Sequence, residues 1–157
     1  MRTMPIARKK LVGVVVLVCT VLFFTMAFKV TVVHGDSMLP TYTSGTVVLV
    51  SKIDAFNGSL HKGEVVLARL GSEVLIKRVT HLAGEVLSGS DAAAFQAARE
   101  RFDRPGPPAN PAFDLRVPAN CVVVEGDNHK ESEDSRKFGP VPVTDILGKV
   151  LNAPSAP

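Results

Sequence analysis

Asp36-Ser37-Met38-Leu39-Pro40-Thr41 follows shortly after a long apolar segment near the start of this 157-residue chain. Two further motifs lie downstream. The second is Leu75-Ile76-Lys77-Arg78-Val79, and the third runs from Gly126-Asp127-Asn128 through Ser132, Asp134, Ser135 and Arg136 to Gly139-Pro140-Val141-Pro142. The first motif contains a serine and the second a lysine, and both lie behind the apolar segment.

Positive charge is concentrated at the N-terminus. Five of the 18 lysines and arginines precede the first acidic residue, Asp36, so 13 cations face 15 acids in residues 36–157, a net charge of −2. Nucleic-acid binding needs basic residues grouped on the folded domain, and the sequence shows no such group. We therefore expect no nucleic-acid partner, and the basic arm of residues 1–10 fits a membrane flank or a targeting segment.

The apolar segment is long enough to cross a membrane. Leu11 to Phe28 carries no charge, and a spanning helix needs about 18–20 such residues. Val30 to Val33 extend the apolar pattern, so a transmembrane helix is predicted over residues 11–33. A cleaved signal peptide is the alternative, although no small-x-small cleavage site precedes Ser37 with room to spare.

Residues 34–157 are expected to form one catalytic β domain. After Thr41, short β-branched runs bounded by turn residues predict strands, and Gly71-Ser72 suits a tight hairpin loop. Short strands at this density predict a mainly β fold, with coiled antiparallel sheets or a partial barrel. We expect strands at Gly45–Val50, Glu64–Leu70, Glu73–Val79, Glu85–Leu87, Phe113–Val117 and Cys121–Val124, then one helical turn and a last strand within Val143–Leu151.

Residues 89–112 interrupt this pattern. Asp91 is placed to cap a short helix that runs to Arg101, and the proline-rich segment 104–111 cannot enter the interior of a sheet. A helix and a loop inserted into the β domain are therefore predicted.

The sequence predicts neither a disulfide nor a metal or cofactor site. Cys19 lies in the apolar segment and Cys121 in the domain, so the two are not expected to pair. The four histidines show no metal-ligand spacing with the cysteines. We therefore expect the chemistry to come from the side chains of the chain itself.

Ser37 and Lys77 are the candidate nucleophile and base. A serine hydroxyl is a weak nucleophile at neutral pH and needs a base. A lysine can serve when burial lowers its pKa enough to populate the neutral amine, and Leu75 and Val79 flank Lys77 on the same strand face. Each motif alone is also compatible with an ordinary exposed side chain, so the hypothesis depends on the three motifs occurring together.

The third motif combines a turn with a candidate ion pair. Gly126-Asp127-Asn128 is a turn signature. Asp134 and Arg136 are two residues apart, so on an extended segment they project to the same side and can pair. An exposed pair of this kind contributes little to stability, and a polar loop is the simpler interpretation of the motif alone.

Together the motifs resemble the catalytic boxes of the type I signal peptidases, membrane-bound serine proteases that use a lysine as general base. The resemblance covers nearly the whole chain and implies roles by position. Ser37 matches the nucleophile and Lys77 the general base. The supporting positions are Ser132, which orients the lysine amine, Asp134 and Arg136, which form a structural ion pair, and Met38 and Arg78, which frame the site.

The resemblance also implies how the substrate is held. The backbone N–H of Ser37 is expected to donate to the oxyanion, and Gly35 stands where many Gram-negative members add a serine hydroxyl, so another donor is required. Family members cleave after small residues at P1 and P3, with the substrate as an added β-strand. The implied partners are precursors with N-terminal presequences and the lipid bilayer, and the need for a second peptidase subunit stays open.

Two branches of this family compete. The string Val124-Glu125-Gly126-Asp127-Asn128, the compact size and the short arm resemble the catalytic subunit of the mitochondrial inner membrane peptidases, whereas bacterial members usually carry Arg in place of His129. The preferred prediction is a single-pass protein of the mitochondrial inner membrane with its catalytic domain in the intermembrane space. The alternative is a leader peptidase of the bacterial plasma membrane, with the domain outside.

Two rival functions fit part of the pattern. A self-cleaving repressor of the SOS type shares the Ser-Lys dyad, but it would carry a DNA-binding segment or a soluble arm in front and lack the third motif. A membrane-tethered pseudopeptidase acting as a subunit is the non-enzymatic alternative. Intact Ser37, Lys77 and Ser132 argue against it.

The charge pattern predicts a single span with the domain on the far side of the membrane. Protease added to mitoplasts, or to bacterial spheroplasts, should digest residues 34–157, and the chain should stay in the membrane after carbonate extraction. Protection of the domain from the added protease would overturn this orientation.

Overall fold

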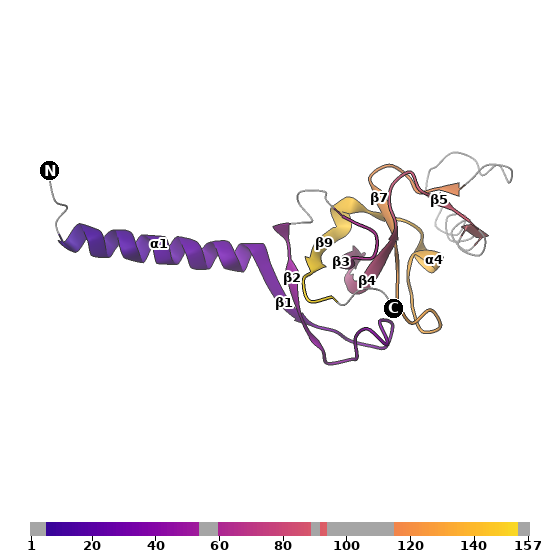
Figure 1. Cartoon of the computed structure of the whole chain (residues 1–157), viewed down its shortest axis with the longest axis horizontal. Coiled ribbons are helices and arrows are strands. Elements are labelled where there is room, and N and C mark those ends of the chain that lie inside the picture. Colours follow the sequence, from indigo (N-terminus) through magenta and orange to yellow (C-terminus); the bar gives the residue numbers. More distant parts are fainter. Residues whose placement is uncertain (1–5, 54–59, 89–91, 94–114, 154–157) are drawn as a thin grey trace.

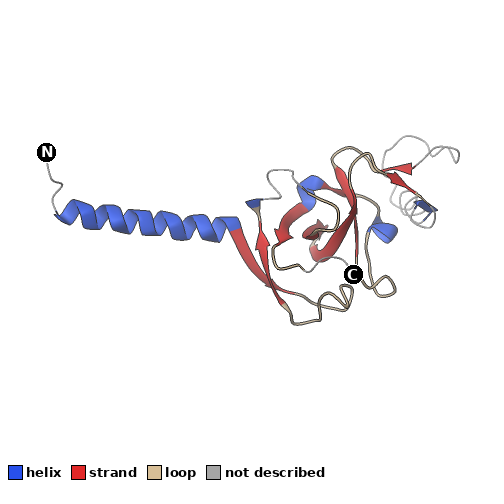
Figure 2. Ribbon diagram, viewed as in Figure 1, coloured by secondary structure: helices blue, strands red, loops and turns tan. Residues whose placement is uncertain are grey.

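The computed structural model describes residues 6–53, 60–88, 92–93 and 115–153. One long helix, α1 (Ile6–Ala27), projects from a β-rich body that holds the rest of the described chain (Figure 1). Colouring by secondary structure shows that this body consists mainly of strands and loops, with short helical segments (Figure 2). The prediction of a mainly β fold behind an N-terminal apolar helix is confirmed.

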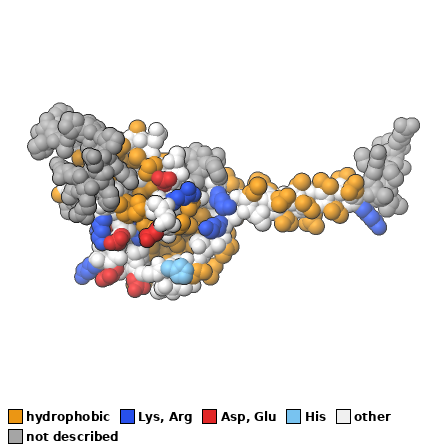
Figure 3. Space-filling view, turned by 180° about the vertical axis from the view of Figure 1, so that it is seen from behind, with side chains coloured by type: hydrophobic (Ala, Val, Ile, Leu, Met, Phe, Trp, Pro, Cys, Tyr) orange, Lys and Arg blue, Asp and Glu red, His pale blue; other side chains and the backbone are white. Residues whose placement is uncertain are grey.

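After Lys10, helix α1 carries no charged side chain and is mainly apolar on all sides. Its side chains from Leu11 to Met26 are exposed, and the space-filling view shows apolar groups along the projecting helix (Figure 3). A helix that is hydrophobic all round fits a bilayer or a protein interior, not a water-exposed surface. Among the described residues, α1 is the one helix long and apolar enough to cross a membrane, judged by length and composition.

The helix ends earlier than the sequence predicts. Instead of continuing to residue 33, α1 ends at Ala27 and the chain continues at once as strand β1 (Phe28–Val32). The helical prediction for these residues is wrong because aromatic and β-branched residues favour a strand where a partner strand is available. That partner is β2 (Val47–Ser51), which pairs antiparallel with β1 along its full length.

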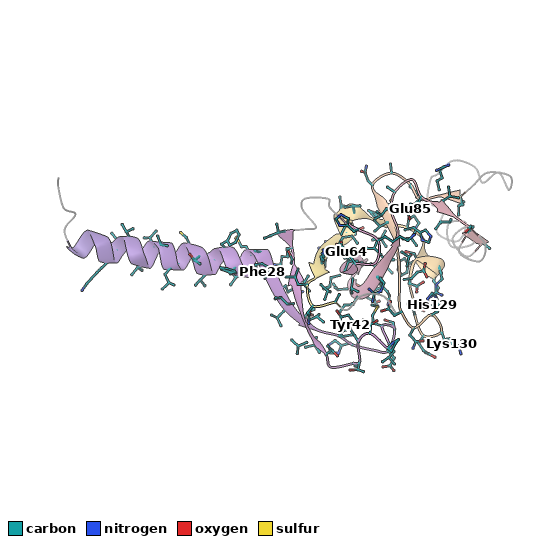
Figure 4. The ribbon with its side chains drawn as sticks, viewed as in Figure 1. Phe28, Tyr42, Glu64, Glu85, His129 and Lys130 are labelled. Carbon is teal, nitrogen blue, oxygen red and sulfur yellow. The ribbon has the colours of Figure 1, made fainter. Side chains whose placement is uncertain are left out.

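The junction between α1 and β1 is fastened to the body. The Ala27 carbonyl accepts a hydrogen bond from the Lys52 backbone N–H at 2.8 Å, and Ala27 is buried. Phe28, which lies where the helix meets the sheet (Figure 4), stacks on Phe24 with ring centroids 5.8 Å apart. The helix therefore passes into the sheet without a linker, and β1 leads directly to the first motif.

A seven-stranded sheet forms the body, in the order β1-β2-β9-β3-β4-β7-β8. Every neighbouring pair is antiparallel, and within the described residues no pairing of β1 with β8 closes the sheet into a barrel. The strands not yet named are β3 (Val65–Leu70), β4 (Glu73–His81), β7 (Cys121–Glu125), β8 (Val141–Pro142) and β9 (Ile146–Val150).

Two local predictions of turns agree with the structure. The β3–β4 pair extends to Leu70 and Glu73, so Gly71-Ser72 forms the predicted hairpin loop. Near the C-terminal end, a 3₁₀ turn, η1 (Val143–Asp145), leads into β9 as the turn-then-strand pattern predicts.

A second, two-stranded sheet flanks the predicted interruption. It pairs β5 (Val86–Leu87) with β6 (Leu115–Arg116), at the end of the body away from α1 (Figure 1). The helix predicted from Asp91 to Arg101 and the proline-rich loop lie outside the described residues, apart from residues 92 and 93.

Both faces of the central strand β3 are buried. Val65 and Leu67 pack into one apolar cluster, and Val66 and Ala68 pack into another, as the alternation of side chains along a strand requires. The first cluster also contains Met38, so it lies beneath the first motif. The sheet therefore gives the first motif an apolar floor.

Candidate active site

The first and second motifs meet in the structure. Ser37 lies on the loop between β1 and β2, and Lys77 lies in β4. The Lys77 Nζ and the Ser37 Oγ are 2.7 Å apart, which is a hydrogen-bond distance. The predicted nucleophile and base are therefore in direct contact, although they come from distant parts of the chain.

The loop that carries Ser37 is shaped by its neighbours. Gly35 has a φ of +80°, a left-handed conformation that glycine adopts without strain. Met38 is 1% exposed and anchors the next residue in the apolar cluster below. The Tyr42 N–H donates to the Met38 carbonyl at 2.8 Å, which closes the turn after the serine.

The Lys77 amine lies in a dry environment. The residue is 3% exposed, and on the same strand face Val79 is fully buried and Leu75 half-buried. Burial lowers the pKa of Lys77, and the nearby carboxylates of Asp134 and Glu133 oppose this shift without cancelling it. The neutral, basic form of the amine is therefore present at lower pH than in an exposed lysine.

The third motif is hydrogen-bonded to the main chain of the loop that carries Ser37. The Asn128 N–H donates to the Ser37 carbonyl at 3.0 Å, and the Asn128 side chain donates to the Asp36 carbonyl at 3.1 Å. Gly126 lies so close that a Cβ there would stand 2.4 Å from the Ser37 carbonyl oxygen and 2.3 Å from the Ser132 Oγ. The sequence indicates only a turn here, so these contacts were missed.

Arg78 and Asp127 form a buried, two-pronged ion pair. The Arg78 Nε and Nη2 donate to the two carboxylate oxygens of Asp127 at 2.8 and 2.7 Å, and the two side chains are 6% and 7% exposed. Arg78 also donates to the Gly63 carbonyl at 2.7 Å and to the Thr41 Oγ1 at 3.3 Å. One guanidinium thus connects all three motifs.

Burial alone would raise the pKa of Asp127, but the hydrogen bonds from Arg78 and Thr41 outweigh burial and leave the pKa lowered. The sequence places Arg78 beside the site and Asp127 in a turn, without pairing them. Two sequence signals could have revealed this pair: Arg78 directly follows the candidate base Lys77, and Asp127 lies in a predicted turn.

The predicted pair of Asp134 and Arg136 is present. The Arg136 Nε and Nη2 donate to the Asp134 carboxylate at 2.9 and 2.6 Å. Asp134 is fully buried and caps the short helix α4 (Ser135–Phe138), and it also accepts from the Gly126 N–H at 3.1 Å. Arg136 reaches His129 Nδ1 at 2.8 Å; His129 and Lys130 lie together on the neighbouring loop (Figure 4). The pair thus fixes the strand end that supports Ser37.

Ser132 lies beside the site, but it does not bind the lysine. Its Oγ is buried and makes no hydrogen bond of normal geometry with the described residues. Burial alone would raise the pKa of Asp134, but the hydrogen bond from Arg136, together with a smaller effect of the neighbouring Ser132, leaves this pKa lowered. The orienting bond from Ser132 to Lys77 is not formed in this structure and stays a prediction.

A groove of about 270 Å³ leads away from the Ser37–Lys77 contact. It runs between β1 and the first half of β4. Among the described strands, none pairs with this half of β4 on the side away from β3, because the pairing of β4 with β7 begins only at Arg78. The lining residues are Lys29, Thr31, Val32, Val33, His34, Ser37, Met38, Leu67, Val74, Leu75, Ile76 and Lys77.

Within the described ranges, no group of three His, Cys, Asp or Glu residues is arranged to hold a metal ion. Cys19 and Cys121 form no disulfide in the described part of the chain.

Comparison with known proteins identifies the family. Residues 7–153 match the family model described as signal peptidase, peptidase S26. The chain therefore belongs to this family of serine peptidases, in agreement with the resemblance of its three motifs.

Relatives occur both in mitochondria and in bacteria. The chain is 34% identical over 123 residues to the mitochondrial ATP-independent inner membrane protease subunit 1a of Arabidopsis thaliana, covering 76% of this chain and 66% of that protein. It is 30% identical over 154 residues to signal peptidase I of Bacillus caldolyticus, covering 86% and 84%. The chain thus spans slightly less than two thirds of the Arabidopsis relative.

Two further similarities complete the comparison. The chain is 28% identical over 158 residues to a protein named inactive signal peptidase IA of Staphylococcus aureus, covering 90% of this chain and 88% of that protein. A crystal structure of signal peptidase I from Enterococcus faecalis V583 matches with a TM-score of 0.39 at 20% identity, covering 58% of this chain and 96% of the other.

The buried amine predicts a distinct response to substitution and pH. Lys77→Arg keeps the positive charge but supplies no neutral base, because a guanidinium stays protonated, so the peptidase rate should fall by about 100-fold or more. In the unchanged protein the rate should rise with pH through a midpoint below the ordinary lysine value of 10.5, as Lys77 loses its proton. Rates on a presequence peptide between pH 6 and 10 measure both effects, and a Lys77→Arg protein with substantial turnover would refute the role of base.

The Arg78–Asp127 pair should dominate the stability of the site. Asp127→Asn leaves a buried guanidinium without its counter-charge, which should lower the free energy of unfolding by about 3 kcal/mol. Since the folded-state pKa of Asp127 is lowered, its contribution is present above the unfolded-state value of about 3.9 and is lost as pH falls through the folded-state value.

Denaturant unfolding of the unchanged and Asp127→Asn proteins, in micelles at several pH values, measures this loss of stability and its dependence on pH. Lys137→Gln is the control, because it breaks the exposed Lys137–Glu133 pair, in which both side chains are more than half exposed, and it should cost under about 1 kcal/mol. Equal costs for the two changes would contradict the dominant role of the buried pair.

Proposed function

We propose that this chain is a membrane-anchored serine endopeptidase that removes N-terminal signal or sorting peptides, with Ser37 as nucleophile and Lys77 as general base. The observation that carries the proposal is the 2.7 Å contact between the Ser37 hydroxyl and a lysine amine that is 3% exposed. An exposed lysine would stay protonated at neutral pH and could not accept a proton. Membership of the signal peptidase family supports the type of reaction.

The reaction proceeds through an acyl-enzyme in this proposal. The neutral Lys77 amine takes the proton of the Ser37 hydroxyl while Oγ attacks the scissile carbonyl carbon. Lys77 then gives this proton to the leaving amine as the C–N bond breaks, which leaves an ester on Ser37. A water molecule attacks the ester, Lys77 accepts the proton of the water, and the proton returns to Ser37 as the acid product leaves.

The negative charge on the carbonyl oxygen needs donors close to Ser37. The Ser37 backbone N–H is the first. Gly35 stands where many Gram-negative members of the family carry a serine whose hydroxyl is a second donor. The φ of Gly35 is +80°, which would strain a serine at this position. A backbone N–H of the loop is therefore the better second donor in this chain.

The substrate is proposed to bind as a strand in the groove. The unpaired edge of β4 before Arg78 offers backbone groups to an extended peptide, which is the usual way a peptide adds to a sheet. The apolar side chains of Val33, Met38 and Leu67 line the groove together with Ser37. This supports the expected preference for small residues at P1 and P3.

Helix α1 is proposed to anchor the protein in the mitochondrial inner membrane, with the domain in the intermembrane space. The Arabidopsis relative supports this compartment by its name, and the word subunit in that name supports assembly with a second chain. The bacterial plasma membrane is the alternative, which the Bacillus relative supports equally well.

A pseudopeptidase that acts as a non-catalytic subunit is the second candidate. A relative that is named inactive motivates it. The contact of Ser37 with a buried Lys77 argues against it, since a chain without catalytic activity has no need to keep a costly buried amine at the serine.

The proposal predicts that Ser37→Ala abolishes cleavage while folding and membrane insertion persist. The full chain, purified in micelles, is incubated with precursor proteins, and mass spectrometry of the new N-termini locates the cut. Ser44→Ala, a change on the same loop, is the control and should retain most of the rate, although the Gly35 N–H donates to Ser44 Oγ at 3.3 Å. Cleavage by the Ser37→Ala protein near the unchanged rate would rule out this nucleophile.

A further inference from the structure

The groove carries a positive charge at the end away from the serine. Lys29 is exposed and lines the groove together with Thr31 and Val33. These three alternate residues lie along one side of the β1 segment. Lys29 is therefore part of the groove wall and not merely a residue at the end of α1.

The Lys29 amine has no acidic partner among the described residues. The structure gives it neither an ion pair nor a hydrogen bond there, whereas other lysines of the body, such as Lys62 and Lys149, pair with glutamates. Apart from Lys77 and His34, the other lining residues are uncharged, and most are apolar. A peptide in this groove would therefore meet one uncompensated positive charge far from the serine.

The position of Lys29 relative to a substrate follows from the proposed function, on which this inference depends. The part of a precursor before the scissile bond leads back to the membrane, and Lys29 lies two residues after α1, on the membrane side of the groove. Four residue steps of about 3.3 Å separate Lys29, in β1, from Val33, the residue directly after β1. An extended substrate would reach the Lys29 amine about four to six residues before the scissile bond.

We propose that Lys29 determines specificity: it favours precursors with Asp or Glu about four to six residues before the scissile bond and disfavours Lys or Arg there. The attraction acts at a partly exposed site, so a modest effect of about two- to five-fold per charge is expected. The charge of Lys29 also affects the rate at which the peptide associates with the protein, since charges at the rim of a binding site steer the ligand.

The test uses the full chain in neutral detergent micelles. A neutral reference peptide that the protein cleaves is varied by placing Glu or Lys at each position from three to eight residues before the scissile bond, and kcat/KM is measured for each. The unchanged protein should prefer Glu over Lys, with the largest ratio at four to six residues. Lys29→Gln should remove the preference, and Lys29→Glu should reverse it.

The control is Lys130→Glu, which makes the same charge change on the loop at the end of the body away from α1 (Figure 4). It should keep the preference of the unchanged protein. Equal preferences in the unchanged and Lys29→Glu proteins would overturn the proposal, as would a preference that is independent of position.

Two more measurements distinguish an effect on the peptide from binding of Lys29 to lipid phosphate and from an effect on turnover. The first measurement repeats the peptide series in phosphatidylcholine vesicles. If the charge preference is absent in both micelles and vesicles while cleavage of the neutral peptide is unchanged, the inference is contradicted and the proposed function stays intact.

The second measurement is the binding of the same peptides to the Ser37→Ala protein. It measures the charge effect without turnover and should show the same preference for Glu. No cleavage of any peptide by the unchanged protein would contradict the proposed function itself.

Discussion

The site depends on one constraint: the Lys77 amine must be kept out of water while it touches the Ser37 hydroxyl. Removing a charged amine from water is costly, so burial favours the neutral form that can act as a base. Strand β4 contributes to this burial because Lys77 pairs with Val66 of the buried strand β3. The carboxylates of Asp134 and Glu133 limit the effect, since they favour the charged amine.

Keeping the amine dry requires that segments far apart in the chain are held together. Two sets of hydrogen bonds do this. Arg78 joins Thr41, Gly63 and Asp127 from a buried position, and Asn128 holds the Ser37 loop through main-chain oxygens. Buried charge pairs contribute to stability mainly when every donor and acceptor has a hydrogen-bond partner. The contacts of Arg78 with three residues fit this rule. The site is thus organised by polar contacts above an apolar floor.

Much of the fold could be predicted from sequence because strand alternation and turn residues are local signals. The β3–β4 hairpin and the final turn and strand agree with the structure. The helix boundary could not be predicted, since the apolar residues 30–33 suit a spanning helix and an edge strand equally until the partner β2 is known.

The site was predictable only in part. The approach of Ser37 and Lys77 followed from resemblance to a family, because no local pattern encodes a contact between distant motifs. The partners of Arg78 and Asn128, and the need for a glycine at 126, depend on the packing of three segments and so could not be derived from spacing.

The most direct test is a measurement of the Lys77 pKa itself. The full chain with ¹³C-labelled lysine side chains, held in micelles, is titrated by NMR, and the Lys77 Cε resonance is assigned by its absence in Lys77→Ala. We expect Lys77 to titrate below the ordinary lysine value of 10.5. A Lys77 amine that titrates at this ordinary value, or above it, would contradict the claim that a buried, neutral lysine activates Ser37.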